Sequence, residues 1–189
     1  MSSKLATIEK LREHLSQVAP MRQAQPCVPT SIPALDTEIG GWPCPGVVSI
    51  HGAIGTGRIG LILNTMQTLT QNERVVAIVD PVGWLYPPGL PGINLQKLML
   101  VRCGAARAGW AATQLVSSGA IPMVVLLDPS SLGANAHRFL RATESGQSTL
   151  FVLSEKPDHR LKASIRLQTL DGQKIKIERG APHQPVITL

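Results

Sequence analysis

Aromatic residues are scarce in this 189-residue chain, where Phe, Trp and Tyr together make up 3% of the sequence. A core with so few rings has to be built from Leu, Ile, Val and Ala, which suits strands buried on both faces of a parallel sheet. Acidic residues are also few, because 12 Asp and Glu stand against 18 Lys and Arg, for a formal charge of +6. This balance favours contact with nucleic acid or an acidic partner and carries no information on the fold.

The chain has only three cysteines, at Cys27, Cys44 and Cys103. Their odd number, their wide spacing and the lack of a Cys-x-x-Cys pair argue against a disulfide framework or a zinc site and favour a reducing compartment. The first residues mix charged and apolar side chains, unlike a signal peptide. No uncharged apolar run approaches the ~20 residues that a membrane-spanning helix needs. We therefore expect a cytoplasmic protein with no metal centre and no membrane contact.

An amphipathic helix is predicted over residues 4–18, because apolar residues recur there at steps of three and four. The apolar stripe consists of Leu5, Ile8, Leu11 and Leu15. Two interpretations stay open: the stripe packs on its own domain, or it docks on another chain. We expect a helical arm over residues 1–24, a core over 25–180 and a tail over 181–189.

From residue 47 onward, short apolar runs alternate with helical patterns. Strands are expected at 47–51, 74–80, 98–102, 122–128 and 149–155, and helices at 58–69, 105–119 and 131–145. This alternation predicts an α/β fold with a mainly parallel central sheet and helices on both of its faces. Further on, the stretches 164–170 and 174–178 alternate apolar and polar residues around Asp171-Gly172, which predicts an antiparallel C-terminal β-hairpin.

The segment HGAIGTGRIG, residues 51–60, follows a predicted strand and opens a predicted helix. Phosphate-binding loops occupy this position because glycines let backbone N–H groups close around phosphates at the positive end of a helix. Gly52 and Gly57 have the spacing of the GxxxxGK[ST] motif, with Gly55 between them.

Two positions of this motif carry other residues. Arg58 stands at the lysine position and Ile59 at the position of the hydroxyl that holds Mg²⁺. A guanidinium is bulkier and planar compared with an ammonium group, and an isoleucine cannot ligate a metal. We interpret the segment as a degenerate phosphate loop that binds nothing, with weak nucleotide or anion binding and then competent hydrolysis as the alternatives.

In order and spacing these features resemble the RecA-type recombinases. The resemblance rests on TSIPALD (30–36) and PxxG (43–46) before the loop, and on the acids that end two strands, Asp80 and Asp128. Within this superfamily the chain is similar to the ImuA branch, small RecA-related proteins of bacterial mutagenesis cassettes. The pattern DPxxxxYPPxL (80–90) and the short length favour that branch over the related SulA-type cell-division inhibitors, which remain an alternative.

The resemblance implies a RecA-like P-loop NTPase core in which Asp128 takes the Walker B position. The position of the catalytic glutamate holds Val82, and that of the glutamine that senses the γ-phosphate holds Glu155. Together with Arg58 and Ile59, four positions lack the residue that catalysis needs. We therefore expect no catalytic residues and no required cofactor.

The resemblance further implies a non-catalytic adaptor of the DNA-damage (SOS) response that assists translesion DNA synthesis. Its N-terminal arm would bind a RecA-type recombinase or a second copy of the chain. Its C-terminal tail, with Val186, Ile187 and Leu189, would bind a Y-family-like polymerase subunit.

Two alternatives come from other classes of protein. One is an ATP-dependent enzyme with an unusual site. The other is a sequence-independent DNA-binding protein whose basic C-terminal residues contact the phosphate backbone, namely Lys162, Arg166, Lys174 and Lys176. A solvated edge hairpin with protective charges explains the same residues without DNA.

Large aromatic side chains offer a further clue in a chain with so few. Trp84 and Tyr86 lie in a proline-rich loop and would mark a partner site if they are exposed. Trp110 lies in a predicted helix, where packing in the core is expected.

Overall fold

The computed structural model describes residues 27–129, 132, 136–181 and 185–189. The predicted N-terminal arm, residues 1–24 with Leu5, Ile8, Leu11 and Leu15, lies outside the described residues, and its helix stays a prediction. Within the described part, no helix has both the length and the apolar character needed to cross a membrane.

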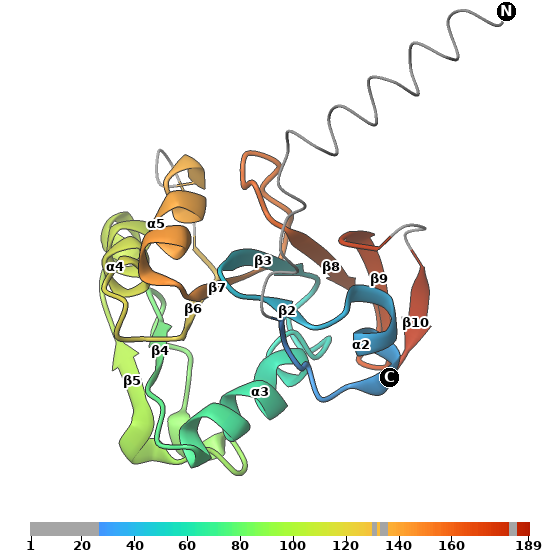
Figure 1. The fold of residues 1–189 in the computed structure, drawn as a ribbon, viewed down its shortest axis with the longest axis horizontal. Helices are drawn as coiled ribbons and strands as arrows, with labels where there is room; N and C mark the ends of the chain where they lie inside the picture. Colours follow the sequence, from blue (N-terminus) through green and yellow to red (C-terminus); the bar gives the residue numbers. More distant parts are fainter. Residues whose placement is uncertain (1–26, 130–131, 133–135, 182–184) are drawn as a thin grey trace, which may run out of the picture.

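An eight-stranded sheet forms the centre of the molecule, with the strand order β10-β9-β8-β3-β7-β6-β4-β5 (Figure 1). The strands are β3 (Gly46–His51), β4 (Val76–Val79), β5 (Leu98–Val101), β6 (Met123–Leu127), β7 (Thr149–Ser154), β8 (Ile165–Thr169), β9 (Lys174–Arg179) and β10 (Val186–Thr188). All pairings from β5 through to β8 are parallel, whereas β8–β9 and β9–β10 are antiparallel. A short antiparallel pair, β1 (Cys27–Val28) with β2 (Trp42–Pro43), stands apart from this sheet. The α/β fold with a mainly parallel central sheet is confirmed.

Helices cover both faces of the sheet, as the alternating pattern predicts. One face packs against α2 (Pro33–Ile39) and α3 (Gly60–Gln71), and the other against α4 (Ala105–Ser117) and α5 (Phe139–Gly146) (Figure 1). Two short 3-10 helices, η1 (Pro87–Gly89) and η2 (Leu95–Lys97), lie between β4 and β5. Successive residues of a strand point to opposite faces, so Val48 and Ile50 join the cluster under α3 while Val47 joins the cluster under α4 and α5.

Leu, Ile, Val and Ala build most of the buried core, as the shortage of rings implies. Among the described residues, the buried aromatic side chains are Trp42, Phe139 and Phe151. Trp42 packs edge-to-face on Phe151 with ring centroids 5.1 Å apart. Its indole N–H donates to the Thr65 hydroxyl at 3.0 Å, which satisfies the polar atom of a fully buried ring.

Two predicted elements differ in the structure. Among the described residues, the helix expected over 131–145 corresponds to α5, Phe139–Gly146. The tail expected over 181–189 contains β10, which pairs with β9 and places Ile187 opposite Ile175. A run of β-branched residues beside an open sheet edge, with one side chain packed on the core, explains this strand.

Trp110 was expected in the core, and this prediction is wrong. Its side chain is 58% exposed, because α4 turns its small residues, among them Ala108 and Ala112, toward the sheet. The spacing of alanines places the buried stripe of α4 on the opposite side from the tryptophan.

Candidate functional site

The segments that resemble a nucleotide site meet at the carboxyl edge of the parallel strands. The glycine-rich loop follows β3, Asp80 follows β4, Asp128 follows β6 and Glu155 follows β7. Parallel strands direct their carboxyl ends to one edge of the sheet, where ligands of open α/β folds bind. The parallel arrangement of these strands therefore brings the four positions to the same edge of the sheet.

The glycine-rich loop keeps the backbone shape of a tight turn. Gly55 and Gly57 both have φ of +87°, which favours glycine. Gly52 is required by close approach, since an added Cβ would collide with the Thr169 hydroxyl and lie 2.6 Å from the Thr169 carbonyl oxygen. The hydroxyl oxygens of Thr56 and Thr169 are 2.6 Å apart, so β8 holds the loop from the side.

Arg58 and Asp128 form an ion pair across this edge. Arg58 donates from Nη1 to Asp128 Oδ1 at 2.5 Å and from Nη2 to Oδ2 at 3.1 Å. The Arg58 side chain is only 9% exposed. A planar guanidinium fits a carboxylate in this two-pronged way, which lysine cannot do. The resemblance implied a Walker B position for Asp128, and nothing in the sequence indicated that Arg58 would bind this carboxylate.

These residues do not fit a nucleotide with its magnesium ion. The carboxylate that would reach the metal is bound by Arg58, and the guanidinium that would reach the phosphates is bound by Asp128. Ile59, at the hydroxyl position, packs against the apolar cluster beneath α3. Positions 58 and 59 therefore offer no oxygen ligand to Mg²⁺, which as a hard cation requires oxygen ligands.

A small cavity of about 120 Å³ adjoins the Arg58–Asp128 pair. Its walls are mainly apolar and include Leu85, Leu127 and Leu153. Val82, at the position expected for a catalytic glutamate, lines this cavity together with Trp84. Glu155 lies instead on a second, larger groove. Positions 58, 59 and 82 thus meet at one place, and position 155 is separate from the small cavity.

Asp80 shapes the loop that carries the exposed aromatic residues. Its buried carboxylate accepts hydrogen bonds from the backbone N–H groups of Gly83 at 2.8 Å, Trp84 at 3.3 Å and Leu85 at 2.9 Å. Trp84 and Tyr86 are 66% and 71% exposed, as the partner-site interpretation requires. Asp80 therefore stabilises the backbone conformation of the loop that follows β4.

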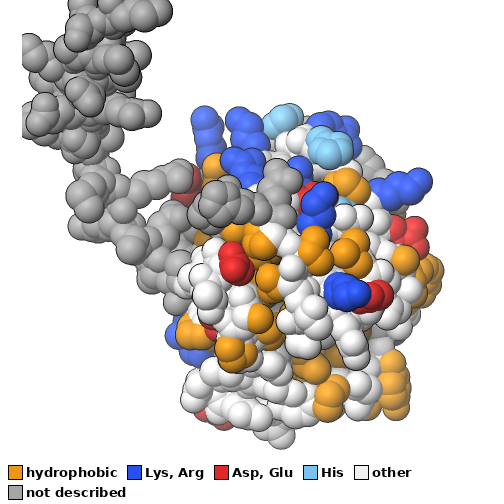
Figure 2. All heavy atoms as spheres, turned by 90° about the vertical axis from the view of Figure 1, so that its right-hand side faces the viewer, with side chains coloured by type: hydrophobic (Ala, Val, Ile, Leu, Met, Phe, Trp, Pro, Cys, Tyr) orange, Lys and Arg blue, Asp and Glu red, His pale blue; other side chains and the backbone are white. Residues whose placement is uncertain are grey.

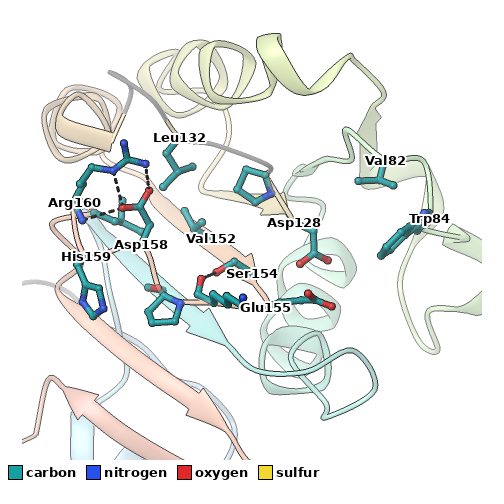
Figure 3. A pocket seen from close by; sticks show the side chains of 15 residues that line it. Val82, Trp84, Asp128, Leu132, Val152, Ser154, Glu155, Asp158, His159 and Arg160 are labelled. Atoms are coloured by element: carbon teal, nitrogen blue, oxygen red, sulfur yellow. Dashed lines mark hydrogen bonds and ion pairs between the residues drawn. The ribbon is translucent and has the colours of Figure 1, made fainter.

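The larger groove, of about 780 Å³, crosses the carboxyl ends of β6 and β7 (Figure 3). Val82 and Trp84 lie at one end, and His159 and Arg160 at the other, with Asp128 and Glu155 between them (Figure 3). The segment after β7 forms its second wall.

Arg160 stabilises that segment by binding Asp158 through Nε at 3.0 Å and Nη2 at 2.9 Å. These hydrogen bonds lower the pKa of the Asp158 carboxyl group below its ordinary value, although burial works in the opposite direction. The Asp158 side chain is therefore a paired carboxylate at neutral pH.

The four basic residues considered for DNA contact have different surroundings. Arg166 is half-buried, and its Nη2 donates to the Leu161 carbonyl at 3.1 Å, so it supports the segment after β7. Lys162 and Lys174 are exposed and Lys176 is half-buried. On β9 the lysines point away from the core while Ile175 and Ile177 are buried, as predicted.

His51, at the end of β3, is a buried residue outside the candidate residues named from the sequence. Its Nε2 lies 3.7 Å from Glu178 Oε2, and within the described residues its Nδ1 has no hydrogen-bond partner. Burial lowers the pKa of His51 below its ordinary value, and the attraction of Glu178, which acts in the opposite direction, is the smaller effect. The sequence signal that could have found it is an ionisable residue at the end of a mainly apolar strand.

The described part of the chain contains no group of three or more His, Cys, Asp or Glu side chains arranged to hold a metal ion. In comparisons with known proteins, no family model and no curated protein sequence matches this chain. The assignment of a function therefore rests on the residues and their geometry.

Proposed function

We propose that this chain is a non-catalytic adaptor on a RecA-like P-loop NTPase scaffold, acting in the DNA-damage response to assist translesion DNA synthesis. The observation that carries the non-catalytic part is the Arg58–Asp128 ion pair. An enzyme that transfers a phosphoryl group needs a cation on the phosphates and a carboxylate near the metal, free to act on the nucleotide. In this chain the cation, Arg58, and the carboxylate, Asp128, bind each other instead.

The position of the degenerate loop supports a RecA-like scaffold. The strand before the loop, β3, lies inside the sheet between β7 and β8, and the loop leads into α3. Asp128 follows β6, which is separated from β3 by β7. This arrangement is compatible with a RecA-like core, and the resemblance of residues 30–57 to the approach of that family to its phosphate loop favours it.

The partners follow from the resemblance and from the exposed apolar residues. The N-terminal arm would engage a RecA-type recombinase, and self-association through the same arm is the related alternative. At the other end of the chain, Val186 and Leu189 are exposed on and beside β10. These residues would contact a Y-family-like polymerase subunit. The polymerase contact thus involves a strand of the sheet, where the sequence predicted a tail.

ATP turnover by the purified full chain tests the non-catalytic assignment. We expect the rate of phosphate release in Mg²⁺ and ATP to equal that of the buffer. Magnesium-dependent turnover well above this background, lost in Arg58→Ala, would show that the chain is an enzyme and contradict the proposal.

Binding to the recombinase tests the adaptor role. The full chain should bind a purified RecA-type filament, and deletion of residues 1–20 should abolish that binding. Equal binding by both forms would refute the role of the arm. Failure of the full chain to bind both the recombinase and the polymerase subunit would refute the adaptor function itself.

A second function, binding to the DNA backbone, is favoured by the exposure of Lys162 and Lys174. It predicts an affinity for DNA that falls steeply with salt and is weakened by Lys162→Glu and Lys174→Glu. An affinity that is absent, or unchanged by both substitutions, would exclude it.

A further inference from the structure

The larger groove has chemically different ends. At one end, Val82 and Trp84 present exposed apolar surface beside the small cavity lined by Leu127 and Leu153. At about 120 Å³ this cavity is well below the about 300 Å³ at which small-molecule sites begin, and it suits a single apolar side chain. An exposed aromatic residue beside such a cavity is typical of the centre of a protein interface.

The aromatic end of the groove is held in place before any partner binds. Asp80 accepts three backbone hydrogen bonds from the loop, and Arg102 Nη2 donates to the Leu85 carbonyl at 3.2 Å. A loop fixed in this way presents Trp84 with little further loss of conformational entropy, which favours binding.

The opposite end of the groove is formed by the segment 155–164, in which Lys156, Arg160 and Lys162 outnumber the acids Glu155 and Asp158. The Asp158 carboxylate is paired with Arg160, and Asp128, which lies between the two ends, is paired with Arg58. Lys156 and His159 are exposed on the same wall, and the remaining acid, Glu155, precedes Lys156. Lys, Arg and His side chains gather at the end of the molecule where the segment between β7 and β8 lies (Figure 2). A ligand that follows the groove from Trp84 therefore meets positive charge.

We propose that this groove binds an extended peptide segment of a partner protein, with an apolar anchor residue at Trp84 and acidic residues at Lys156 and His159. The proposal rests on the adaptor function and names the chemistry of one partner contact. The apolar side chain enters the cavity beside Val82 and Leu127. The acidic side chains then reach the basic end, in agreement with the formal charge of +6 on the chain.

A peptide fits these observations better than a nucleic acid. Trp84 is able to stack on a base, but the cavity beside it has mainly apolar walls, with little to bind a phosphate or a sugar. Among the described residues, Arg58 is the buried cation at this edge, and it is already bound by Asp128. A peptide with one apolar residue followed by acidic residues would contact both ends of the groove.

Selection from a random dodecapeptide display library on the purified full chain tests the proposal. We expect enriched sequences with one Leu, Phe or Trp followed by several Asp or Glu. A synthetic, fluorescein-labelled peptide of the enriched sequence should bind about tenfold or more weakly to Trp84→Ala and to Lys156→Glu. Trp110→Ala is the matched control, because Trp110 is similarly exposed but lies on α4, and it should bind as the original chain does.

Three results would overturn the proposal. Enrichment of basic or uncharged peptides would show that the groove does not select acidic residues. Binding of the selected peptide that is equal in Trp84→Ala and Trp110→Ala would place the site elsewhere. Binding of a labelled oligothymidylate that is stronger than that of the peptide and is lost in Trp84→Ala would make the groove a nucleic-acid site.

The outcome can be separated from that of the proposed function. If the recombinase and polymerase subunit bind the original chain and Trp84→Ala equally well, the groove is not a partner contact while the adaptor function stands. If the chain turns over ATP but still selects acidic, apolar-anchored peptides, the groove proposal stands without the non-catalytic assignment.

Discussion

At the scale of single residues, Arg58 and Asp128 determine the chemistry of the carboxyl edge. They are 70 positions apart in the chain and meet through two hydrogen bonds. Each neutralises the other in a setting where an isolated charge would be costly. An arginine at position 58 allows this pairing, because the planar guanidinium binds both carboxylate oxygens, which a lysine ammonium cannot do.

A double-mutant cycle on this pair should reveal a coupling of about 1–3 kcal/mol in the free energy of unfolding. Arg58→Ala leaves Asp128 without its cation, and Asp128→Ala leaves a mostly buried guanidinium. The double variant removes both charges and should be more stable than the sum of the single losses implies. Urea denaturation of the four proteins measures the coupling. If the double variant loses as much stability as the two single variants together, the interaction between Arg58 and Asp128 contributes nothing to the free energy of unfolding.

The same cycle on Arg160 and Asp158 is its control. That pair has similar bidentate geometry, but Arg160 is on the surface, where solvent screens the charges. Its coupling should be clearly smaller than that of Arg58 and Asp128. A coupling equal to or larger than theirs would contradict the argument from burial.

His51 gives the molecule a dependence of stability on pH. Burial lowers its pKa in the folded state, against the attraction of Glu178 and together with the charges of Arg166, His159 and Lys176. The unfolded imidazole therefore binds a proton at a higher pH than the folded one. The free energy of unfolding should decrease as the pH falls below the ordinary histidine value of about 6.5 and level off below the folded pKa.

Urea denaturation at several pH values between about 7.5 and 5 measures this effect. His51→Gln should show a flatter profile over the same range. His137→Gln, which removes an exposed histidine that is not among the charges acting on His51, should retain the slope of the original chain. An unchanged slope in His51→Gln would mean that another group causes the loss.

At the scale of elements, the sequence correctly predicted the strands and helices that are encoded by local periodicity. The strands ending at Asp80 and Asp128 and the helix at 105–119 agree with β4, β6 and α4, because apolar runs and 3.6-residue spacing are local signals. Local patterns did not reveal the strand β10, whose formation depends on a distant partner. β10 exists because β9 offers an open edge, and no feature within 181–189 reveals that edge.

The candidate site shows the same division between local and long-range information. The glycines at 52, 55 and 57 were recognisable from spacing alone, and so were the unusual residues at 58 and 59. The Arg58–Asp128 pair and the Thr56–Thr169 contact depend on chain folding across 70 and 113 positions. The exposure of Trp84 depends on Asp80, whose three hydrogen bonds are a property of the folded loop.

The glycine-rich loop provides a prediction on one element. Gly52→Ala should destabilise the fold by about 3 kcal/mol or more, since the new Cβ collides with Thr169 on β8. Gly60→Ala is the matched control at the start of α3, where an added Cβ meets nothing within 4 Å. That change should be neutral or stabilising by about 0.5 kcal/mol, because alanine favours helix. Thermal and urea denaturation compare the two. Similar effects of both substitutions would contradict the close approach of β8.

At the scale of the whole molecule, the fold is an α/β domain with a mainly parallel sheet, and polar groups at the carboxyl edge of that sheet bind one another. Arg58 binds Asp128, Asp80 binds its own loop, and Thr56 contacts Thr169. Each contact occupies a polar group within the protein itself. The stability of the domain should therefore be independent of nucleotide, and its exposed surface remains for partners.

Mg²⁺ with ATP should leave the melting temperature of the full chain unchanged to within about 1 °C. A ligand present at 100 times its Kd adds about 2.7 kcal/mol to the free energy of unfolding, which corresponds to several degrees for a domain of this size. Differential scanning calorimetry at millimolar ATP, with and without Mg²⁺, measures the shift. Asp128→Ala frees the Arg58 guanidinium, so this variant should gain a small, magnesium-independent stabilisation by ATP or inorganic phosphate. A shift of several degrees in the original chain that requires Mg²⁺ would mean that nucleotide displaces Arg58 from Asp128, and the pair would then be a switch rather than a permanent closure.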